Sequence, residues 1–243
     1  MPAAVVFALP SEPKGGSAPD ASRILRAVVG LLVSEDLLEQ ELLTFSVAPV
    51  AAASGEPAIR IATIDERSGT ALNGLGEARI PIDGHEMLLR PVEAHPLAGR
   101  RSYEEIFRRA SATAKEFCFE FLTPTSFHHG DLDVPLPLSR QLYNSLYRRW
   151  KHVHTRFALH EEVVDAADHH LAISSLKIET TSFKEDRSTR IGFTGTVAFK
   201  ASGSVQRDIL HELNVLADYA FFASAGQKTQ IGMGVVRRVE AGR

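Results

Sequence analysis

A glycine-rich segment near the C-terminus, AGQKTQIGMG at residues 225–234, combines residue types that bind phosphate. Glycine has no side chain to keep a backbone at a distance, so N–H groups of such a loop can approach phosphate oxygens. The residues concerned are three glycines and a Lys-Thr pair: Gly226, Gly232, Gly234, Lys228 and Thr229. A Walker A motif needs a strand before its glycines and a helix after them. Here we expect a helix first and a strand second, which disfavours an NTPase. The alternative is a tight turn that needs glycine only for its backbone conformation.

Two histidine pairs could also do chemistry. His128 and His129, in the loop FLTPTSFHHG, could donate to phosphates or transfer protons near neutral pH, or could simply be surface histidines. His169 and His170 follow Asp168 in a pattern similar to the Asp-His-His signature of metal phosphoesterases. The other acidic ligands at matching spacings are missing, so we expect no metal there.

Basic residues gather in one segment of a chain whose formal net charge is −3. Residues 140–156 contain five Arg or Lys and two His without an acid. A basic face on a nearly neutral protein fits selective contact with a polyanion, although a solvated helix face is an equally plain interpretation. The expected contacts outside the glycine-rich loop are Arg148, Arg149, Lys151 and Arg237.

Composition limits the class of protein that carries these residues. A chain of 243 residues suits two domains of about 100–120 residues each. Hydrophobic residues make up 44% and charged residues 23%, which is typical of an ordinary globular protein. The single cysteine, Cys118, excludes an intrachain disulfide and makes a cysteine-based zinc site very unfavourable, so a cytoplasmic location is expected. No apolar run approaches the ~20 residues of a membrane span, and the N-terminus does not resemble a signal peptide.

The order of predicted elements then positions the candidate residues. In the first half, strands are expected at 3–9, 44–50, 57–65 and 85–95, and helices at 23–43 and 66–78. In the second half, strands are expected at 115–125, 171–184, 189–201 and 231–239, and helices at 138–157 and 206–224. Each half reads β-α-β-β-α-β, so the fold class is α+β with two tandem ferredoxin-like domains. We predict an N-terminal domain at 1–98, a partly helical connecting segment at 99–114, and a C-terminal domain with the glycine-rich loop at 115–243.

Four stretches, taken in order, resemble a known family. TFSVAPV and FLTPTSFHHG resemble two of its segments, LPLSRQLYNSLYRRWKH is similar to its proline-rich lead into a helix, and GFTGTVAFK with LADYAFFASAGQKTQIGMGVVR resembles its C-terminal glycine-rich loop. The family is that of the CRISPR-associated endoribonucleases that cut precursor crRNA within its repeats, members of the RAMP superfamily.

The resemblance implies two ferredoxin-like folds that bind CRISPR repeat RNA along a basic face. It implies metal-independent cleavage by attack of a 2′-hydroxyl on the adjacent phosphate, with no cofactor. It also implies that the product crRNA is retained in an effector complex with other CRISPR subunits. Many members carry a histidine just after the first helix. Here the corresponding stretch is Leu37-Leu38-Glu39, so this chain resembles a variant without that histidine.

The remaining candidates for catalysis are therefore cations and the histidines of the second half. Arg23 and Arg26 are three residues apart and share a helix face, and arginine stabilises charge although it is a poor base. Together with Lys228 they could stabilise the transition state, while His128 and His129 are candidates for proton transfer. Two other functions stay open: a non-catalytic crRNA-binding subunit and a metal-dependent phosphoesterase that uses the histidine pairs.

Overall fold

The chain forms two compact units in a computed structural model. The structure describes residues 1–10, 21–33, 38, 43–52, 55–82, 84–153, 156–185 and 188–240. The first unit comprises Met1–Ser102 with Thr229–Gly232, and the second comprises Tyr103–Lys228 with Met233–Arg243. Among the described helices, none has the length and apolar character needed to cross a bilayer.

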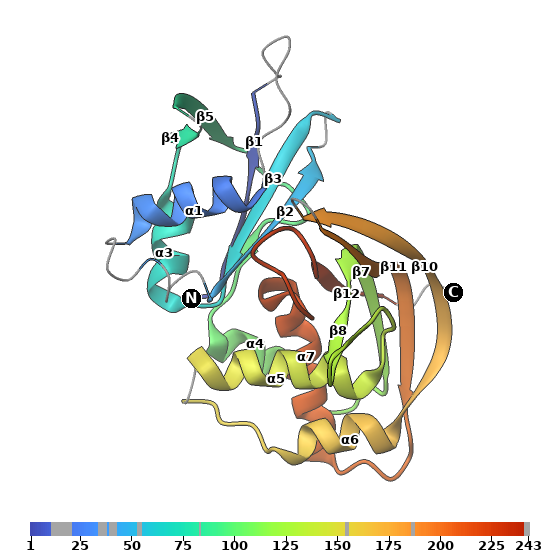
Figure 1. Ribbon diagram of the computed structural model, residues 1–243. Helices are drawn as coiled ribbons and strands as arrows, with labels where there is room; N and C mark the ends of the chain where they lie inside the picture. Colours follow the sequence, from blue (N-terminus) through green and yellow to red (C-terminus); the bar gives the residue numbers. More distant parts are fainter. Residues whose placement is uncertain are drawn as a thin grey trace. The chain divides into compact units, whose positions relative to one another are not determined.

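The first unit is an antiparallel sheet with helices on one face (Figure 1). Its elements are β1 (Ala3–Ala8), α1 (Ala21–Leu32), β2 (Phe45–Ala51), β3 (Pro57–Thr63), α3 (Glu66–Gly74), β4 (Ala78–Ile82), β5 (His85–Pro91) and β6 (Gly99–Arg100). The strand order is β2-β3-β1-β5-β4, and β6 pairs with β1. The first three strands and β5 follow the arrangement of a ferredoxin-like unit.

Apolar spacing on α1 explains how this helix docks. Ile24, Leu25, Val28 and Val29 recur at helical spacing and are buried against the sheet. The arginines of the same helix fall between these positions and are exposed. Burial of one helix face thus fixes which face α1 presents to solvent.

The opposite face of this sheet buries a charge beneath the chain that follows β5. Arg60 is fully buried and donates from Nε to the carbonyl of Leu97 at 3.1 Å. Burial lowers the pKa of Arg60 to about 10. His95 holds the same segment, because one ring nitrogen accepts from the amide of Leu97 at 3.1 Å and the other lies 3.0 Å from the carbonyl of Ala51.

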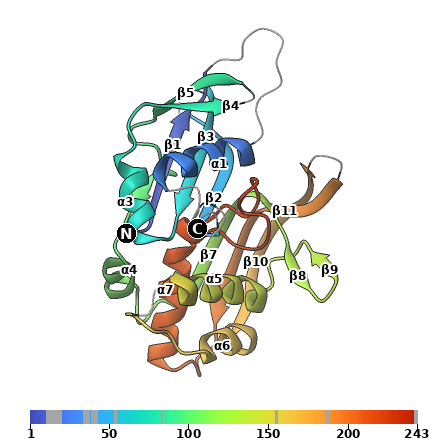
Figure 2. The same cartoon turned by 60° about the vertical axis from the view of Figure 1, so that its left-hand side comes forward.

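The second unit has a four-stranded antiparallel sheet covered on one face by helices (Figure 2). Its elements are α4 (Tyr103–Arg109), β7 (Glu116–Thr125), β8 (Phe127–His129), β9 (Leu132–Val134), α5 (Ser139–Val153), α6 (Glu162–His170), β10 (Leu171–Glu185), β11 (Ser188–Ala201), α7 (Arg207–Ala223) and β12 (Val236–Val239). The strand order is β10-β11-β7-β12, and β8 with β9 forms a separate hairpin.

Alternation along β7 builds the core of this unit. Every second residue of the strand is buried, beginning with Phe117, Phe119 and Phe121. Trp150 of α5 packs edge-to-face on Tyr219 of α7 with ring centroids 5.0 Å apart. This contact joins the two helices, and Tyr143 of α5 packs edge-to-face on Phe119 of β7 with ring centroids 6.2 Å apart.

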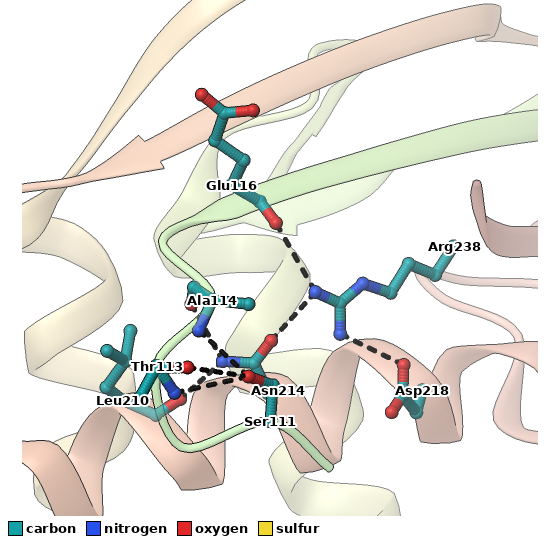
Figure 3. A network of polar contacts seen from close by, with 8 residues as sticks. All are labelled: Ser111, Thr113, Ala114, Glu116, Leu210, Asn214, Asp218 and Arg238. Atoms are coloured by element: carbon teal, nitrogen blue, oxygen red, sulfur yellow. Dashed lines mark hydrogen bonds and ion pairs between the residues drawn. The ribbon is translucent and has the colours of Figure 1, made fainter. Parts of the chain in front are cut away.

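A polar network joins the last strand to the last helix (Figure 3). Arg238 donates to Asp218 at 3.0 Å, to the side-chain oxygen of Asn214 at 2.7 Å and to the carbonyl of Glu116 at 3.3 Å. The amide nitrogen of buried Asn214 donates in turn to the carbonyls of Ala114 and Leu210 at 3.0 and 2.8 Å. Arg238 is therefore part of the scaffold.

The predicted α+β fold with two tandem ferredoxin-like domains is confirmed. Several details differ. Strand β4 was not expected, and the helix predicted at 66–78 ends at Gly74. The last strand, expected at 231–239, begins only at Val236, because the glycines before it form a loop with positive φ angles. The first helix ends at Leu32, and most of its predicted continuation to residue 43 lies outside the described residues. The short helix α6 and the hairpin β8–β9 were not expected. The predicted connecting segment, 99–114, contains β6 and α4.

Candidate functional site

The glycine-rich loop links α7 to β12 and folds back on itself. Gly226, Gly232 and Gly234 have φ angles of 81°, 123° and 81°, and Lys228 has the unusual value of 57° for a residue with a side chain. Ala225 donates its amide to the carbonyl of Gly234 at 2.8 Å, closing the loop at its base. The Gly234 amide donates to the carbonyl of Pro124 at 3.1 Å.

Gly226 is required by the close approach of another part of the backbone. A Cβ atom at this position would overlap the carbonyl oxygen of Ser126. The Gly226 amide donates to Ser145 Oγ at 2.9 Å. Gln227 donates its backbone amide to the Ser126 carbonyl at 3.1 Å and its side-chain amide to Ser126 Oγ at 2.8 Å. The amides of Gly226 and Gly234 are thus occupied by protein oxygens, and these glycines shape the loop.

The tip of the loop belongs to the first unit and lines a hollow there. The carbonyl of Thr229, which is buried, accepts from the amide of Val47 on β2 at 2.9 Å. Next to it lies a hollow of about 350 Å³ with both polar and apolar walls. Its lining residues are Ser22, Arg23, Leu25, Arg26, Leu43, Gln230 and Ile231. Gly232 is buried at the end of this tip.

Arg23 and Arg26 line two hollows on the surface of the first unit. A second hollow of about 300 Å³ is lined by the same two arginines with Ala27, Pro81 and Ile82. Both arginines are exposed on α1. Two guanidinium groups flanked by apolar walls suit a chain of phosphates that carries flat, apolar bases.

The position at which the resemblance implies a histidine is apolar. Leu38 is half-buried and packs against the core of the first unit. Its neighbours Leu37 and Glu39 lie outside the described residues. A leucine side chain cannot transfer a proton, so any proton transfer must come from other groups.

The histidines of the second unit lie on the hairpin β8–β9. Both His128 and His129 are exposed. His128 Nδ1 lies 2.8 Å from Asp133 Oδ1, and Asp133 also accepts from Arg190 of β11 at 3.1 Å. Adjacent residues of a strand point to opposite faces, so His129 faces away from this pair.

Acids of α6 neutralise part of the predicted basic helix. Arg140 of α5 lies 2.8 Å from Asp165 and 3.2 Å from Asp168. Lys151 of the same helix lies 2.6 Å from Glu161, and this hydrogen bond raises the pKa of Lys151. The acidic residues at 161–168 therefore pack beside the basic helix, and the surface of α5 is less positive than its own residues indicate.

The other predicted contacts differ in their accessibility. Arg148 is exposed on α5. Arg149 is half-buried, and burial of its guanidinium beside Tyr219 lowers its pKa. Arg237 of β12 is paired with Glu120 at 2.7 Å. Lys228 is half-buried in the loop.

The second histidine pair ends α6. His169 Nδ1 lies 2.8 Å from the carbonyl of Asp165, and His170 Nδ1 lies 3.0 Å from Ser202 Oγ. Within the described ranges, no three His, Cys, Asp or Glu side chains are grouped so that they could hold a metal ion.

Several site residues were missed from the sequence. Asp133 and Arg190 are 57 residues apart. Gln230 lies in the glycine-rich stretch but was not singled out, and Ile231 was read as the start of a strand. For Asp133 a signal was present, because GD at residues 130–131 is a hairpin turn that brings residues 128 and 133 opposite each other. No local signal indicates Arg190, since long-range pairing decides its neighbours.

Comparisons with known proteins show which proteins the chain resembles in sequence and fold. The family model described as "CRISPR-associated endoribonuclease Cas6" matches residues 119–236. A curated Cas6 endoribonuclease from Streptococcus thermophilus is 26% identical over 125 residues, which is 51% of this chain and 51% of that protein. The matched region thus spans about half the length of that relative.

Solved structures match over nearly the whole chain. A Cas6 product complex has a TM-score of 0.79 at 24% identity, covering 98% of this chain and 99% of that one. A Cas6 structure from Thermus thermophilus has a TM-score of 0.77 at 26% identity, covering 98% of both. The family model and the curated relative each match about half of the chain, so the chain is similar to CRISPR-associated endoribonuclease Cas6 over that part and shares the fold of solved Cas6 structures.

Proposed function

We propose that this chain is a metal-independent endoribonuclease that binds CRISPR repeat RNA and cleaves precursor crRNA. The 2′-oxygen of one nucleotide attacks the adjacent phosphorus, and the 5′-oxygen of the next nucleotide leaves. The observation that carries the proposal is the hollow at Arg23 and Arg26, which is also lined by the tip of the glycine-rich loop. We also propose that the protein is cytoplasmic, retains its product and serves with other effector subunits. A solved structure of a Cas6 product complex supports the proposed retention of the product.

Two arginines can supply most of what such a reaction needs from an enzyme. Negative charge grows on the phosphoryl oxygens as phosphorus becomes pentacoordinate, and preorganised donors stabilise it more than the ground state. The guanidinium groups of Arg23 and Arg26 present planar sets of N–H donors that match phosphate oxygens. Their side chains are neighbours on α1, about 5–6 Å apart at Cβ, so both can contact one phosphate or two successive ones. We assign them to charge stabilisation.

The second unit supplies the remaining assigned groups. His128 and His129 are the candidates for proton transfer, since histidine exchanges protons near neutral pH. RNA contacts are assigned to the loop residues Gly226, Lys228, Thr229, Gly232 and Gly234 and to Arg148, Arg149, Lys151 and Arg237. Among these, exposed Arg148 is the strongest candidate for a phosphate contact. Lys151 and Arg237 are paired with Glu161 and Glu120, so each must give up its carboxylate partner before it can bind an RNA phosphate.

A second candidate function follows from Leu38. If the apolar side chain in place of a histidine leaves no effective catalyst, the chain is an RNA-binding effector subunit that holds crRNA without cutting it. Both functions use the same surfaces, so only a cleavage assay separates them.

The test is an incubation of the full chain with repeat RNA from the array of the same genome, in excess EDTA. The proposed function predicts cleavage at one phosphate that leaves a 2′,3′-cyclic phosphate. A single 2′-deoxy substitution at the attacking nucleotide should abolish it. Tight binding with intact RNA would establish the second candidate instead. Cleavage that disappears with EDTA and returns with a divalent cation would establish a metal-dependent phosphoesterase.

The matched variants are Arg23→Ala and Arg67→Ala, the latter on the exposed start of α3. Loss of one charge-stabilising donor should lower the cleavage rate about 10²–10³-fold. Arg67→Ala should cleave as the unmodified chain does. An Arg23→Ala variant that loses binding and cleavage equally would make this arginine a docking residue.

A further inference from the structure

The hairpin β8–β9 holds a histidine whose ring is fixed by an acid. His128 and Asp133 are directly opposite each other in the antiparallel register, and Nδ1 lies 2.8 Å from Oδ1. The second carboxylate oxygen of Asp133 accepts from Arg190 Nη1 at 3.1 Å. The side chains of Asp133 and Arg190 are only 31% and 28% exposed, whereas that of His128 is 65% exposed. A half-buried ion pair thus anchors an exposed imidazole.

This contact decides which ring nitrogen can act on a substrate. A carboxylate has only acceptors, so Nδ1 of His128 must be the donor in the contact with Asp133. The other nitrogen, Nε2, is left on the exposed side of the ring. A carboxylate in this position orients an imidazole and selects its tautomer, as in carboxylate–histidine pairs of hydrolases and metal sites. Nε2 can therefore gain or release a proton while the ring stays in place.

The hairpin begins where the glycine-rich loop is anchored. Ser126, two residues before His128, accepts two hydrogen bonds from Gln227 through its carbonyl and its hydroxyl. Gln227 immediately precedes Lys228. The fixed imidazole and the loop cation therefore project from two segments of the second unit that are bonded to each other.

We propose that Asp133 and Arg190 position His128 as the general acid of the cleavage. The inference rests on the proposed function and extends it. The 2′-oxygen forms a bond to phosphorus, and its proton passes to solvent water. The bond from phosphorus to the 5′-oxygen breaks, and that oxygen takes the proton of His128 Nε2. The products are a 2′,3′-cyclic phosphate and a 5′-hydroxyl, and the neutral imidazole regains its proton from water.

A general acid is needed because the leaving group is a poor one. An alkoxide is strongly basic, and a guanidinium group is too weak an acid to protonate it. Among the described candidates, His128 is held by a carboxylate and His129 is not. Positioned acids of this kind contribute about 10²–10⁴-fold to a rate.

The experiment compares two leaving groups in the full chain. Single-turnover rates at saturating enzyme are measured on repeat RNA and on the same RNA with sulfur in place of the bridging 5′-oxygen at the cleaved phosphate. Sulfur leaves without being protonated. The variants are His128→Ala, Asp133→Asn and Asp133→Glu, with Asp131→Asn as the control because Asp131 lies in the turn of the same hairpin. Dissociation constants and thermal melting are measured for each.

We expect His128→Ala to lose about 10²–10⁴-fold on the oxygen substrate and at most about threefold on the sulfur substrate. Asp133→Asn should lose about 10–100-fold on oxygen, with a similar recovery on sulfur and unchanged RNA affinity. Asp133→Glu should restore part of the rate, and Asp131→Asn should change nothing.

Equal losses on both substrates, or a loss confined to affinity, would overturn the general-acid assignment while leaving the endoribonuclease intact. Failure of the unmodified chain to cut either substrate would instead overturn the proposed function.

Discussion

Arg238 on β12 donates to the side-chain oxygen of Asn214 on α7 at 2.7 Å. The side-chain amide of Asn214 donates in turn to the carbonyl of Ala114, in the segment before β7. One buried amide thereby holds three parts of the second unit. Both polar atoms of the Asn214 side chain are hydrogen-bonded. Removing this side chain would therefore leave its partners in the network with unpaired donors or acceptors.

We predict that Asn214→Ala lowers the free energy of unfolding by about 2 kcal/mol, because a buried carbonyl and part of the Arg238 guanidinium lose their partners. Denaturant unfolding of the full chain measures this. Asn144→Ala, at an exposed position of α5, is the control and should change stability by less than about 0.5 kcal/mol. Equal stability of the two variants would show that water replaces the amide without cost.

Gly226→Ala should destabilise the loop and not only alter RNA contact. The residue has φ at 81°, and the added Cβ meets the Ser126 carbonyl. We expect a loss of at least about 2 kcal/mol in the free energy of unfolding, from backbone strain and steric overlap. Gly203→Ala is the control, since open space surrounds that glycine. A Gly226→Ala variant as stable as Gly203→Ala, but deficient in RNA binding, would contradict the shaping role.

His160 should make stability depend on pH. Its Nδ1 lies 2.6 Å from buried Glu212, and this hydrogen bond raises the pKa of His160 above the ordinary value of 6.5. A raised folded-state pKa means that the stabilisation is fully present below about pH 6.5 and is lost as pH rises through the raised value. Melting temperatures of the unmodified chain and His160→Gln should therefore differ most in mild acid and converge in mild alkali. His152→Gln, at an exposed position of α5, should show no such trend.

Arg148→Ala should weaken RNA binding more than Arg140→Ala. Arg148 is exposed, whereas Arg140 is engaged by two aspartates. If Arg148 neutralises one phosphate, its loss lowers the slope of log K against log salt by about 1. Titrations at several salt concentrations measure both slopes. An equal loss in the Arg140→Ala variant would mean that RNA displaces the aspartates of α6.

The sequence was sufficient to predict the fold because the elements carry strong local patterns. Alternation of Phe117, Phe119 and Phe121 indicates β7, and the fourfold spacing of Leu142, Leu146 and Trp150 indicates α5. Both patterns reflect burial on one face, which the structure has. The short strands β8 and β9 have too few residues for a periodic signal, so the hairpin was missed.

The candidate site was predictable in its residue types but not in their partners. The glycines and arginines can be recognised in the sequence. The acids that pair with Arg140, Lys151 and Arg237 come from other elements and cannot. The net charge of residues 140–156 alone therefore overestimates the positive charge of the surface that they form. The partner of His128 lies on the opposite strand of the same hairpin. Arg190 comes from β11, and only the tertiary fold brings it close to Asp133.

The bond between the Val47 amide and the Thr229 carbonyl has a consequence for biosynthesis. Residues 1–102 leave the ribosome long before Thr229–Gly232, which complete the first unit. During translation the Val47 amide on the outer edge of β2 therefore lacks the Thr229 carbonyl while more than half of the chain is still being synthesised. A gene fragment that stops at residue 102 would encode the same unfinished edge, so the first unit is not a module that can be cut out and transplanted by its N-terminal segment alone.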